Sequence, residues 1–189
     1  MSTLKKVLVF AASNSRASIN KQLVTHAAEI LKEEIHPTVD IDILDLNDFE
    51  MPIYSIDRET TDGIPEAARQ FYAAIGQADA LLISYAEHNG LYTVAFKNIF
   101  DWCSRIDRNV FQDKPMVIMA ASPGAGGGAN VLKTALEAAS YFGADIKGSL
   151  SVGRFSQTFN SDSGELADPQ LASALREQLN LLLPTVGFE

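Results

Sequence analysis

A cluster of hydrogen-bond donors close to the N-terminus is the first feature of this sequence that could do chemistry. Three hydroxyls, two amides and one guanidinium directly precede a predicted helix, in Ser13, Asn14, Ser15, Arg16, Ala17, Ser18, Ile19 and Asn20. Helix N-termini attract anions, and these side chains add donors without adding negative charge. No Asp or Glu occurs between Ala11 and Ala28. The segment therefore predicts a phosphate site, although Ser18 alone would fit an ordinary helix cap.

A second polar segment follows Tyr85 and precedes another predicted helix. Its side chains and free backbone groups could bond the edge of a planar ring, through Ala86, Glu87, His88, Asn89 and Gly90. Asn89 and Gly90 also fit a simple turn. His88 is the acid–base candidate, but a lone histidine more often has a structural or solvent-facing position. The other histidines, His26 and His36, give no metal-ligand spacing, so no metal site is predicted.

A glycine-rich segment supplies the third candidate loop, Ser122, Pro123, Gly124, Ala125, Gly126, Gly127 and Gly128. Four glycines let the backbone approach a flat ligand closely, whereas a flexible turn would need fewer. Gly124-x-Gly126-x-x-Ala129 also matches a dinucleotide fingerprint. That match is weak, because it follows the fourth predicted strand and no acid ends the next one. A P-loop is excluded, because no Gly-Lys-Ser/Thr follows the glycines.

Alternating strands and helices must position these three segments. Apolar runs predict strands at 4–12, 39–46, 80–84, 115–121 and 145–152, and helical periodicity predicts helices at 19–34, 66–76, 93–105, 128–142 and 169–183. Residues 47–64 resemble a loop. This order predicts one α/β domain over 1–189, a flavodoxin-like three-layer α/β/α sandwich with a five-stranded parallel sheet of order 2-1-3-4-5. Ligands bind such sheets at the carboxyl ends of the strands, where all three segments lie.

Composition narrows the functional class. The net charge of −9 argues against a nucleic-acid or anionic-membrane surface. No apolar stretch reaches the roughly 20 residues of a membrane span, and the run Val7–Ala12 is too short for a signal peptide. Cys103 is the only cysteine, which excludes an intrachain disulfide and favours a cytoplasmic location.

Taken together and in this order, the three segments resemble the motifs of the NADPH-dependent FMN reductase family, which includes azobenzene, chromate and quinone reductases. Residues 12–20 resemble G-S-x-R-x-x-S-x-N. Residues 86–102 resemble P-E-Y-N-x-S-x-P-G-x-L-K-N-x-x-D-W, with matches at Glu87, Asn89, Lys97, Asn98, Asp101 and Trp102. Residues 122–128 match S-P-G-x-x-G-G. The chain departs from the family at His88, which replaces Tyr, and at Thr93-Val94, which replace Pro-Gly.

The resemblance implies a role for each segment. Non-covalent FMN would have its phosphate held by Ser13, Ser15, Arg16, Ser18, Asn20 and the amide of Ile19. Residues 86–90 would line the isoalloxazine ring, and residues 122–128 would meet its other edge. NADPH or NADH would reduce the flavin in a ping-pong cycle, and a small acceptor (quinone, flavin, azo compound or metal oxyanion) would then take the electrons. No protein nucleophile or general base is required, so no catalytic residue is predicted.

The resemblance also implies a homo-oligomer, either a homodimer or a homotetramer. Two alternatives stay open at this point. One is a flavodoxin-like electron carrier that does not oxidise NAD(P)H directly. The other is a flavin-free interaction domain that keeps the fold, because a fold alone does not fix a function.

Overall fold

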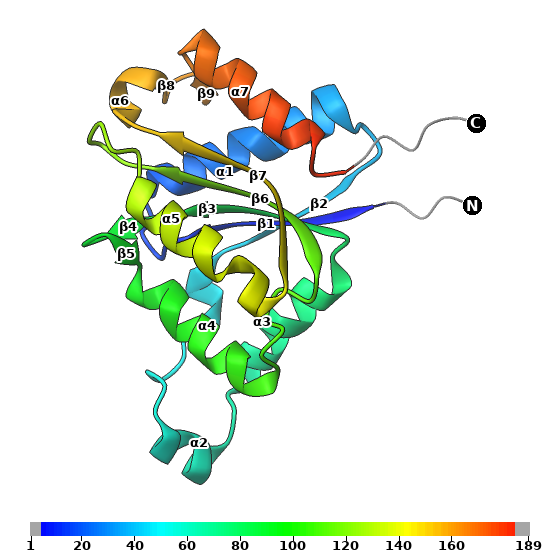
Figure 1. Cartoon of the computed structure of the whole chain (residues 1–189), viewed down its shortest axis with the longest axis vertical. Coiled ribbons are helices and arrows are strands. Elements are labelled where there is room, and N and C mark those ends of the chain that lie inside the picture. Colours follow the sequence, from blue (N-terminus) through cyan, green and yellow to red (C-terminus); the bar gives the residue numbers. More distant parts are fainter. Residues whose placement is uncertain (1–4, 184–189) are drawn as a thin grey trace.

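Five parallel strands form the central sheet of the computed structural model, which describes residues 5–183 (Figure 1). The strands are β1 (Lys6–Ala12), β2 (Asp40–Leu44), β3 (Ala80–Tyr85), β6 (Lys114–Ala121) and β7 (Ala144–Val152). They are ordered β2-β1-β3-β6-β7, and every neighbouring pair is parallel. The predicted order 2-1-3-4-5 and the flavodoxin-like fold class are therefore confirmed.

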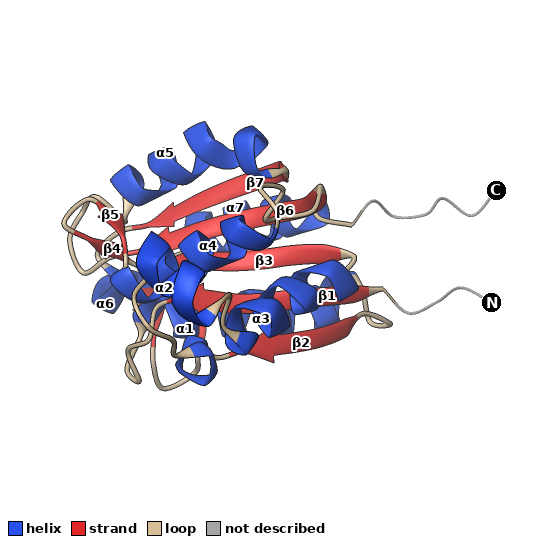
Figure 2. Cartoon of the chain, turned by 90° about the horizontal axis from the view of Figure 1, so that it is seen from below, coloured by secondary structure: helices blue, strands red, loops and turns tan. Residues whose placement is uncertain are grey.

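Helices cover both faces of this sheet. The long helices are α1 (Ile19–Ile30), α3 (Glu66–Gln77), α4 (Val94–Ile106), α5 (Ala129–Ala138) and α7 (Pro169–Asn180). Helices α1 and α7 lie on one face, and α3, α4 and α5 lie on the other, with α3 and α4 in front of the sheet in Figure 2. Within residues 5–183, no helix combines the length and the apolar character that a membrane crossing requires.

The strand sequences explain this three-layer arrangement. Successive side chains of a strand point to opposite faces, so a strand covered on both sides must be apolar throughout. In β1, Val7 and Val9 pack with α1 and α7, whereas Leu8 and Phe10 pack with α3 and α4. All six residues of β3 are buried. The edge strand β2 is only partly buried, as the alternating polar residues of 39–46 indicate.

Shorter elements complete the chain and connect the sheet to its helices. They are η1 (Leu31–Ile35), η2 (Leu46–Phe49), α2 (Ile56–Asp62), β4 (Glu87–His88), β5 (Leu91–Tyr92), η3 (Ala139–Phe142), α6 (Phe155–Thr158), β8 (Phe159–Asn160) and β9 (Glu165–Leu166). The predicted first helix thus ends as a π-helical turn, and the predicted helix 128–142 ends as a 3₁₀ turn. Gly143 closes the latter in the left-handed region, where glycine is the usual residue.

Two predicted boundaries need correction. Residues 47–64 are not wholly a loop, because α2 forms within them between the cap Ser55 and Gly63, which has a positive φ. No residue of α2 is buried, so the sequence carries no apolar periodicity to reveal it. The last helix begins at Pro169, as predicted, with Asp168 as its cap, but it ends at Asn180, three residues before 183. Residue 4 of the first predicted strand lies outside the described residues.

Candidate functional site

The three candidate loops meet at the carboxyl ends of the strands, where β4, β5 and α6 lie in Figure 2. Several hydrogen bonds join them to the elements around them, and three of these connect different loops or helices. The Thr93 hydroxyl, at the start of α4, donates to the Ala12 carbonyl at 2.9 Å. The Val131 N–H donates to Glu87 Oε2 at 2.9 Å. The Arg154 N–H donates to the Gly124 carbonyl at 2.8 Å. The three loops are therefore fixed relative to one another.

The first loop (residues 13–20) presents free donors to solvent. Residues 14–17 are exposed. Within the described part of the chain, the backbone N–H groups of Arg16, Ala17 and Ile19 donate to no protein acceptor. Ser18 caps α1 by accepting from the Lys21 N–H at 3.2 Å, and the first turn of α1 contains no acidic residue. These features suit a bound anion.

Arg16 is the cation that the first loop has available for such an anion. Lys21, the other cation of this stretch, has its ammonium 2.6 Å from Asp45 Oδ2 at the end of β2. Hydrogen bonds lower the pKa of Asp45 to about 2; the bond from Lys21 contributes most, and the bond from the Asn47 N–H contributes next. Arg16 is exposed and forms no ion pair among residues 5–183.

The predicted contact between Asn20 and a phosphate would need its side-chain amide to face the ligand. Its side chain is buried and faces the sheet. Oδ1 accepts from the Ser84 hydroxyl and from the Ala121 N–H, each at 2.8 Å, and Nδ2 donates to the Ala121 carbonyl at 3.2 Å. The β3–β6 ladder ends at the pair Tyr85 and Ala120. The side-chain amide of Asn20 therefore takes the place of the next β3 residue and bonds the backbone of Ala121. We interpret Asn20 as a residue that positions the first loop.

The second loop (residues 86–90) is the start of a β-hairpin. Asn89 and Gly90 have φ values of 54° and 81° and join β4 to β5. Positive φ at both central residues is typical of a type I′ turn, which confirms the turn interpretation of these two residues. Glu87 is turned toward α5, where its carboxylate accepts from the third backbone N–H of the helix. The His88 side chain is exposed.

The third loop (residues 122–128) divides its glycines between two roles. A Cβ at Gly128 would lie 2.7 Å from the Ala120 Cβ, and one at Gly127 would collide with the Ser151 hydroxyl. Both residues have positive φ, so close packing and backbone conformation require glycine there. A Cβ at Gly124 or Gly126 would meet no atom within 4 Å. The backbone at these two positions is thus open to a ligand.

Helix α4 holds the segment that forms the outer wall of the site. We name this segment, residues 51–59, the strap. Asn98 Oδ1 accepts from the Tyr54 N–H at 2.9 Å, and Asn98 Nδ2 donates to the Met51 carbonyl at 3.1 Å. The buried Trp102 donates its indole N–H to the Pro52 carbonyl at 2.7 Å. Thr93 caps α4 by accepting from the Phe96 N–H, so the helix starts well without the Pro-Gly of the family motif.

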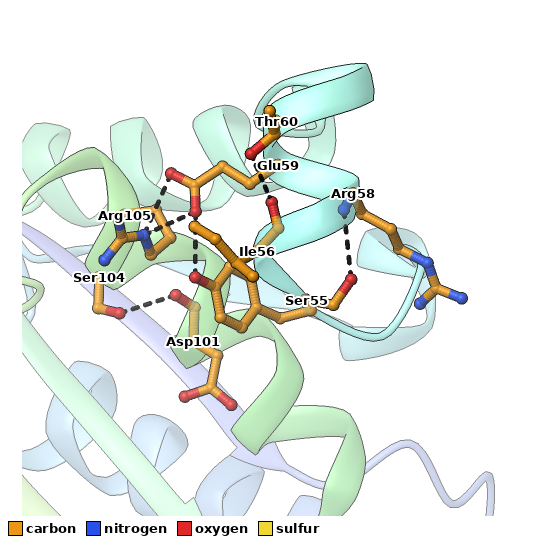
Figure 3. A network of polar contacts seen from close by, with 9 residues as sticks. Ser55, Ile56, Arg58, Glu59, Thr60, Asp101, Ser104 and Arg105 are labelled. Carbon is orange, nitrogen blue, oxygen red and sulfur yellow. Dashed lines mark hydrogen bonds and ion pairs between the residues drawn. The ribbon is translucent and has the colours of Figure 1, made fainter.

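A second group of contacts holds the far end of the strap, as Figure 3 shows. Glu59 on α2 accepts from the Arg105 Nε at 2.9 Å, and the Tyr54 hydroxyl donates to the same carboxylate at 3.0 Å. The Tyr54 ring meets Trp102 edge to face, with centroids 5.0 Å apart. Helix α2 projects away from the sheet in Figure 1, and these contacts hold it against α4.

A cavity of about 320 Å³ lies between the strap, the first loop, the hairpin and the start of α4. This volume falls in the range of ligand pockets. Polar and apolar side chains share its lining, which consists of Asn14, Leu46, Asn47, Phe49, Glu50, Met51, Ile53, His88, Thr93, Val94, Ala95, Asn98 and Ile99. Of the predicted site residues, only His88 lines it. No sequence motif marks the wall formed by residues 46–53, because its place follows from hydrogen bonds to Asn98 and Trp102.

These observations fit FMN. The first loop has unpaired N–H groups, one available guanidinium and no acid for a phosphate. The third loop has open backbone for a flat ring. Among residues 5–183, no three His, Cys, Asp or Glu side chains are placed to hold a metal ion. Fold and site together define a flavodoxin-like α/β protein whose loops suit a flat, phosphate-bearing ligand.

Comparison with known proteins identifies the family. The family model described as NADPH-dependent FMN reductase matches residues 5–157, and the chain belongs to this family. It is accordingly an oxidoreductase of a family described by its use of FMN and NADPH. A probable NADPH:quinone oxidoreductase 1 of Oryza sativa is 33% identical over 181 residues, which cover 92% of this chain and 88% of the relative.

Solved structures show the same fold. FerB, a flavoenzyme NAD(P)H:(acceptor) oxidoreductase from Paracoccus denitrificans, matches with a TM-score of 0.74 at 23% identity and covers 94% of each chain. An FMN-dependent NADH-azoreductase from Bacillus anthracis, solved in complex with FMN, matches with a TM-score of 0.66 at 13% identity. That match covers 93% of this chain and 98% of the azoreductase.

Proposed function

We propose that this protein binds FMN at the three loops and passes electrons from NADPH or NADH through it to a small acceptor. The observation that carries the proposal is the acid-free first loop, whose free N–H groups lie at the carboxyl end of β1 beside open glycine backbone. The acceptor class comprises quinones, free flavin, azo compounds and metal oxyanions. The quinone oxidoreductase among the relatives supports the first of these.

The residues of the first loop would hold the phosphate. Ser13, Ser15, Ser18 and Arg16 would donate from their side chains, and Ile19 would donate its backbone N–H. Asn20 would contribute indirectly, because its three internal hydrogen bonds fix the start of α1 on the sheet. The polar groups of this loop thus divide into donors for the ligand and a residue that positions them.

The other two loops would hold the ring and its edge. Residues 86–90 supply backbone groups and the exposed His88, and Ser122, Pro123 and Gly124 supply open backbone. Gly127 and Gly128 would shape the third loop without touching the ring, because they pack against β6 and β7. FMN, when bound, supplies the two-electron chemistry, and the protein supplies binding, orientation and electrostatics.

The cavity beside His88 offers room for the electron acceptor. Its apolar residues, among them Phe49, Met51 and Val94, suit a flat organic molecule, and Asn14 and Asn98 offer polar contacts at its edge. The strap forms one wall, so acceptor size would depend on the bonds between the strap and α4. Because several acceptor classes share a flat shape, the acceptor is best identified by a screen with both nicotinamide nucleotides.

Reconstitution with FMN tests the proposal directly. Purified protein should bind FMN at micromolar concentration, and NADPH or NADH should bleach the bound flavin under anaerobic conditions. The variant Arg16→Ala should weaken the binding of FMN more than the binding of riboflavin, which lacks the phosphate. Equal losses for both ligands would refute the phosphate assignment, and no FMN binding by the wild-type protein would refute the whole proposal.

The electron-carrier alternative makes a different prediction for the same protein. A carrier would accept electrons only from a partner reductase, whereas the proposed enzyme should oxidise NAD(P)H alone. Family membership favours the enzyme. Steady oxidation of NAD(P)H with a quinone and without any second protein would decide between the two.

We also propose a homo-oligomer, as either a dimer or a tetramer. Large apolar side chains are exposed around the cavity, with Ile53 at 65% and Val94 at 70% exposure, and Leu91 of the hairpin is also exposed. A patch of this kind is typical of a surface that a second protein chain covers. Light scattering on the FMN-loaded protein would measure the mass, and a monomer at micromolar concentration would contradict the proposal.

The cytoplasm is the compartment we propose. Cys103, the only cysteine, is buried, and no disulfide within the chain is possible. Such cysteine usage is typical of a reducing compartment. Cell fractionation would test the location, and recovery in a secreted fraction would contradict it.

A further inference from the structure

Arg154, at the carboxyl end of β7, has an unusual backbone conformation. Its φ and ψ are 50° and 46°, which lie in the left-handed region. This region is unfavourable for an L-residue and costs glycine almost nothing. Strained residues of this kind occur preferentially at functional sites, where the surrounding structure holds them.

The third loop holds Arg154 in this conformation. The Arg154 N–H donates to the Gly124 carbonyl at 2.8 Å, and the Phe155 N–H donates to the Ser122 carbonyl at 3.2 Å. A Cβ at the preceding Gly153 would lie 2.6 Å from the Ala125 carbonyl oxygen, so the two segments are in close contact. Arg154 is thereby fixed beside the open backbone of Gly124.

The side chain of Arg154 is available to a ligand. It is exposed, and among residues 5–183 it forms no ion pair and no side-chain hydrogen bond. The chain has a net charge of −9, and within the described ranges eight other Lys or Arg side chains are paired with carboxylates. At the carboxyl end of the sheet, Arg16 and Arg154 are the two described arginines without such partners.

The sheet order separates these two arginines. The first loop follows β1 and Arg154 follows β7, with β3 and β6 between them. Three strand spacings of about 4.8 Å place the two strand ends about 14 Å apart. Arg154 therefore lies three strand spacings away from the loop that would hold the FMN phosphate, and a different anion is its expected partner.

We propose that Arg154 binds a phosphate group of the incoming nicotinamide nucleotide. This inference rests on the proposed function, in which two phosphate-bearing nucleotides meet at one site. The first loop takes the phosphate of FMN, and the ring lies against the second and third loops. A nucleotide that reaches the ring from the side of the third loop passes Arg154, whose guanidinium is suited to phosphate recognition.

The variant Arg154→Gly separates this role from a structural one. Glycine accepts the left-handed backbone, so the melting temperature should stay the same or rise. Binding of NADP⁺ to the FMN-loaded protein, measured by calorimetry, should weaken about tenfold, as loss of one charge-assisted phosphate contact predicts. The KM for NADPH should rise by a similar factor. Arg154→Lys, which keeps a charge, should recover part of the affinity.

Arg69→Ala is the matched control, because it removes an exposed arginine of α3 that forms no ion pair in the described chain. It should leave NADP⁺ binding unchanged. A parallel titration with NAD⁺ identifies the group: equal weakening for both nucleotides assigns the pyrophosphate, and weakening for NADP⁺ alone assigns the 2′-phosphate. Either result supports the proposal.

Two results would overturn it. The first is that Arg154→Gly binds NADP⁺ and NAD⁺ with an affinity within twofold of that of the wild type, when the wild type itself binds FMN and oxidises NADPH. The second is that Arg154→Gly weakens the binding of FMN more than the binding of riboflavin, which would place Arg154 at the FMN phosphate. Failure of the wild-type protein to bind FMN would instead refute the proposed function itself, so the two failures are distinguishable.

Discussion

Replacing Asn20 by alanine distinguishes a positioning residue from a direct ligand of the phosphate. In the structure, its side-chain amide makes three hydrogen bonds, two to the backbone of Ala121 and one to the hydroxyl of Ser84. Asn20→Ala removes all three and leaves the buried N–H and carbonyl of Ala121 without these partners. A direct phosphate ligand would have no such role before FMN binds.

The expected magnitude follows from those bonds. Each contributes about 1 kcal/mol net, and a buried group left without a partner costs about 1–3 kcal/mol. Asn20→Ala should therefore lower the free energy of unfolding of the FMN-free protein by about 3–5 kcal/mol. Domains are typically stable by about 5–15 kcal/mol, so the variant should still fold in the cold but unfold at clearly lower urea concentration.

Urea titration of the FMN-free protein, followed by circular dichroism, measures the loss. Ser84→Ala removes one of the three bonds and should cost about 1 kcal/mol. The double variant should be about 1 kcal/mol less destabilised than the sum of the single ones, because both single changes remove the same bond. Asn14→Ala, an exposed asparagine of the same loop, should change stability by less than about 0.5 kcal/mol.

One result would refute this reasoning. If Asn20→Ala leaves the stability of the FMN-free protein within about 1 kcal/mol of the wild type but weakens FMN strongly, Asn20 acts on the ligand itself. The burial of Asn20 and its bonds to β6 would then have little energetic weight. A large loss of stability, with FMN affinity restored when the variant is kept folded in the cold, supports the positioning role.

Three further predictions concern the elements around the site. Asp45→Asn should cost less than about 1 kcal/mol near pH 7, because its pair is partly exposed. The fold lowers the pKa of Asp45 from 3.8 to about 2, so this stabilisation is present above about pH 4 and is lost as the pH falls through about 2. Urea titrations of wild type and variant at about pH 7 and about pH 2 measure the difference, and an equal loss of stability at the two pH values would contradict the prediction. Burial raises the pKa of Cys103 to about 12, so Ellman's reagent at pH 8 should label the unfolded protein and leave the folded one unlabelled. Trp102→Phe removes the hydrogen bond to Pro52 and should make the strap more sensitive to limited proteolysis, and an unchanged cleavage rate would contradict this.

The sheet and the location of the site could be predicted from local sequence patterns. Buried strands in a two-sided sheet are apolar throughout, and their alternation with helices fixes a parallel order. Once the order is known, loops after the first, third and fourth strands must meet at one end of the sheet. The turn at Asn89-Gly90 is likewise local, because the two residues themselves accept positive φ.

What could not be predicted depends on contacts between distant residues. Helix α2 buries no side chain, and its place is set by the Glu59–Arg105 pair across 46 residues. Asn20 is 101 residues from Ala121, so its inward orientation is not apparent from the first loop alone. Glu87 likewise caps α5 across 44 residues. A motif shows which residue types occur together, but the fold decides which of them face the ligand.

Residues that build the site and residues that bind a ligand at it should respond differently to substitution. Asn20, Thr93 and Glu87 have their polar groups engaged with backbone in the protein itself, so their loss should already weaken the FMN-free fold. Arg16 and Arg154 have exposed, unpaired guanidinium groups, so their loss should leave the FMN-free fold unchanged and appear only when a phosphate-bearing ligand is added. Stability of the FMN-free protein therefore separates the residues that build the site from those that bind at it, before any activity is measured.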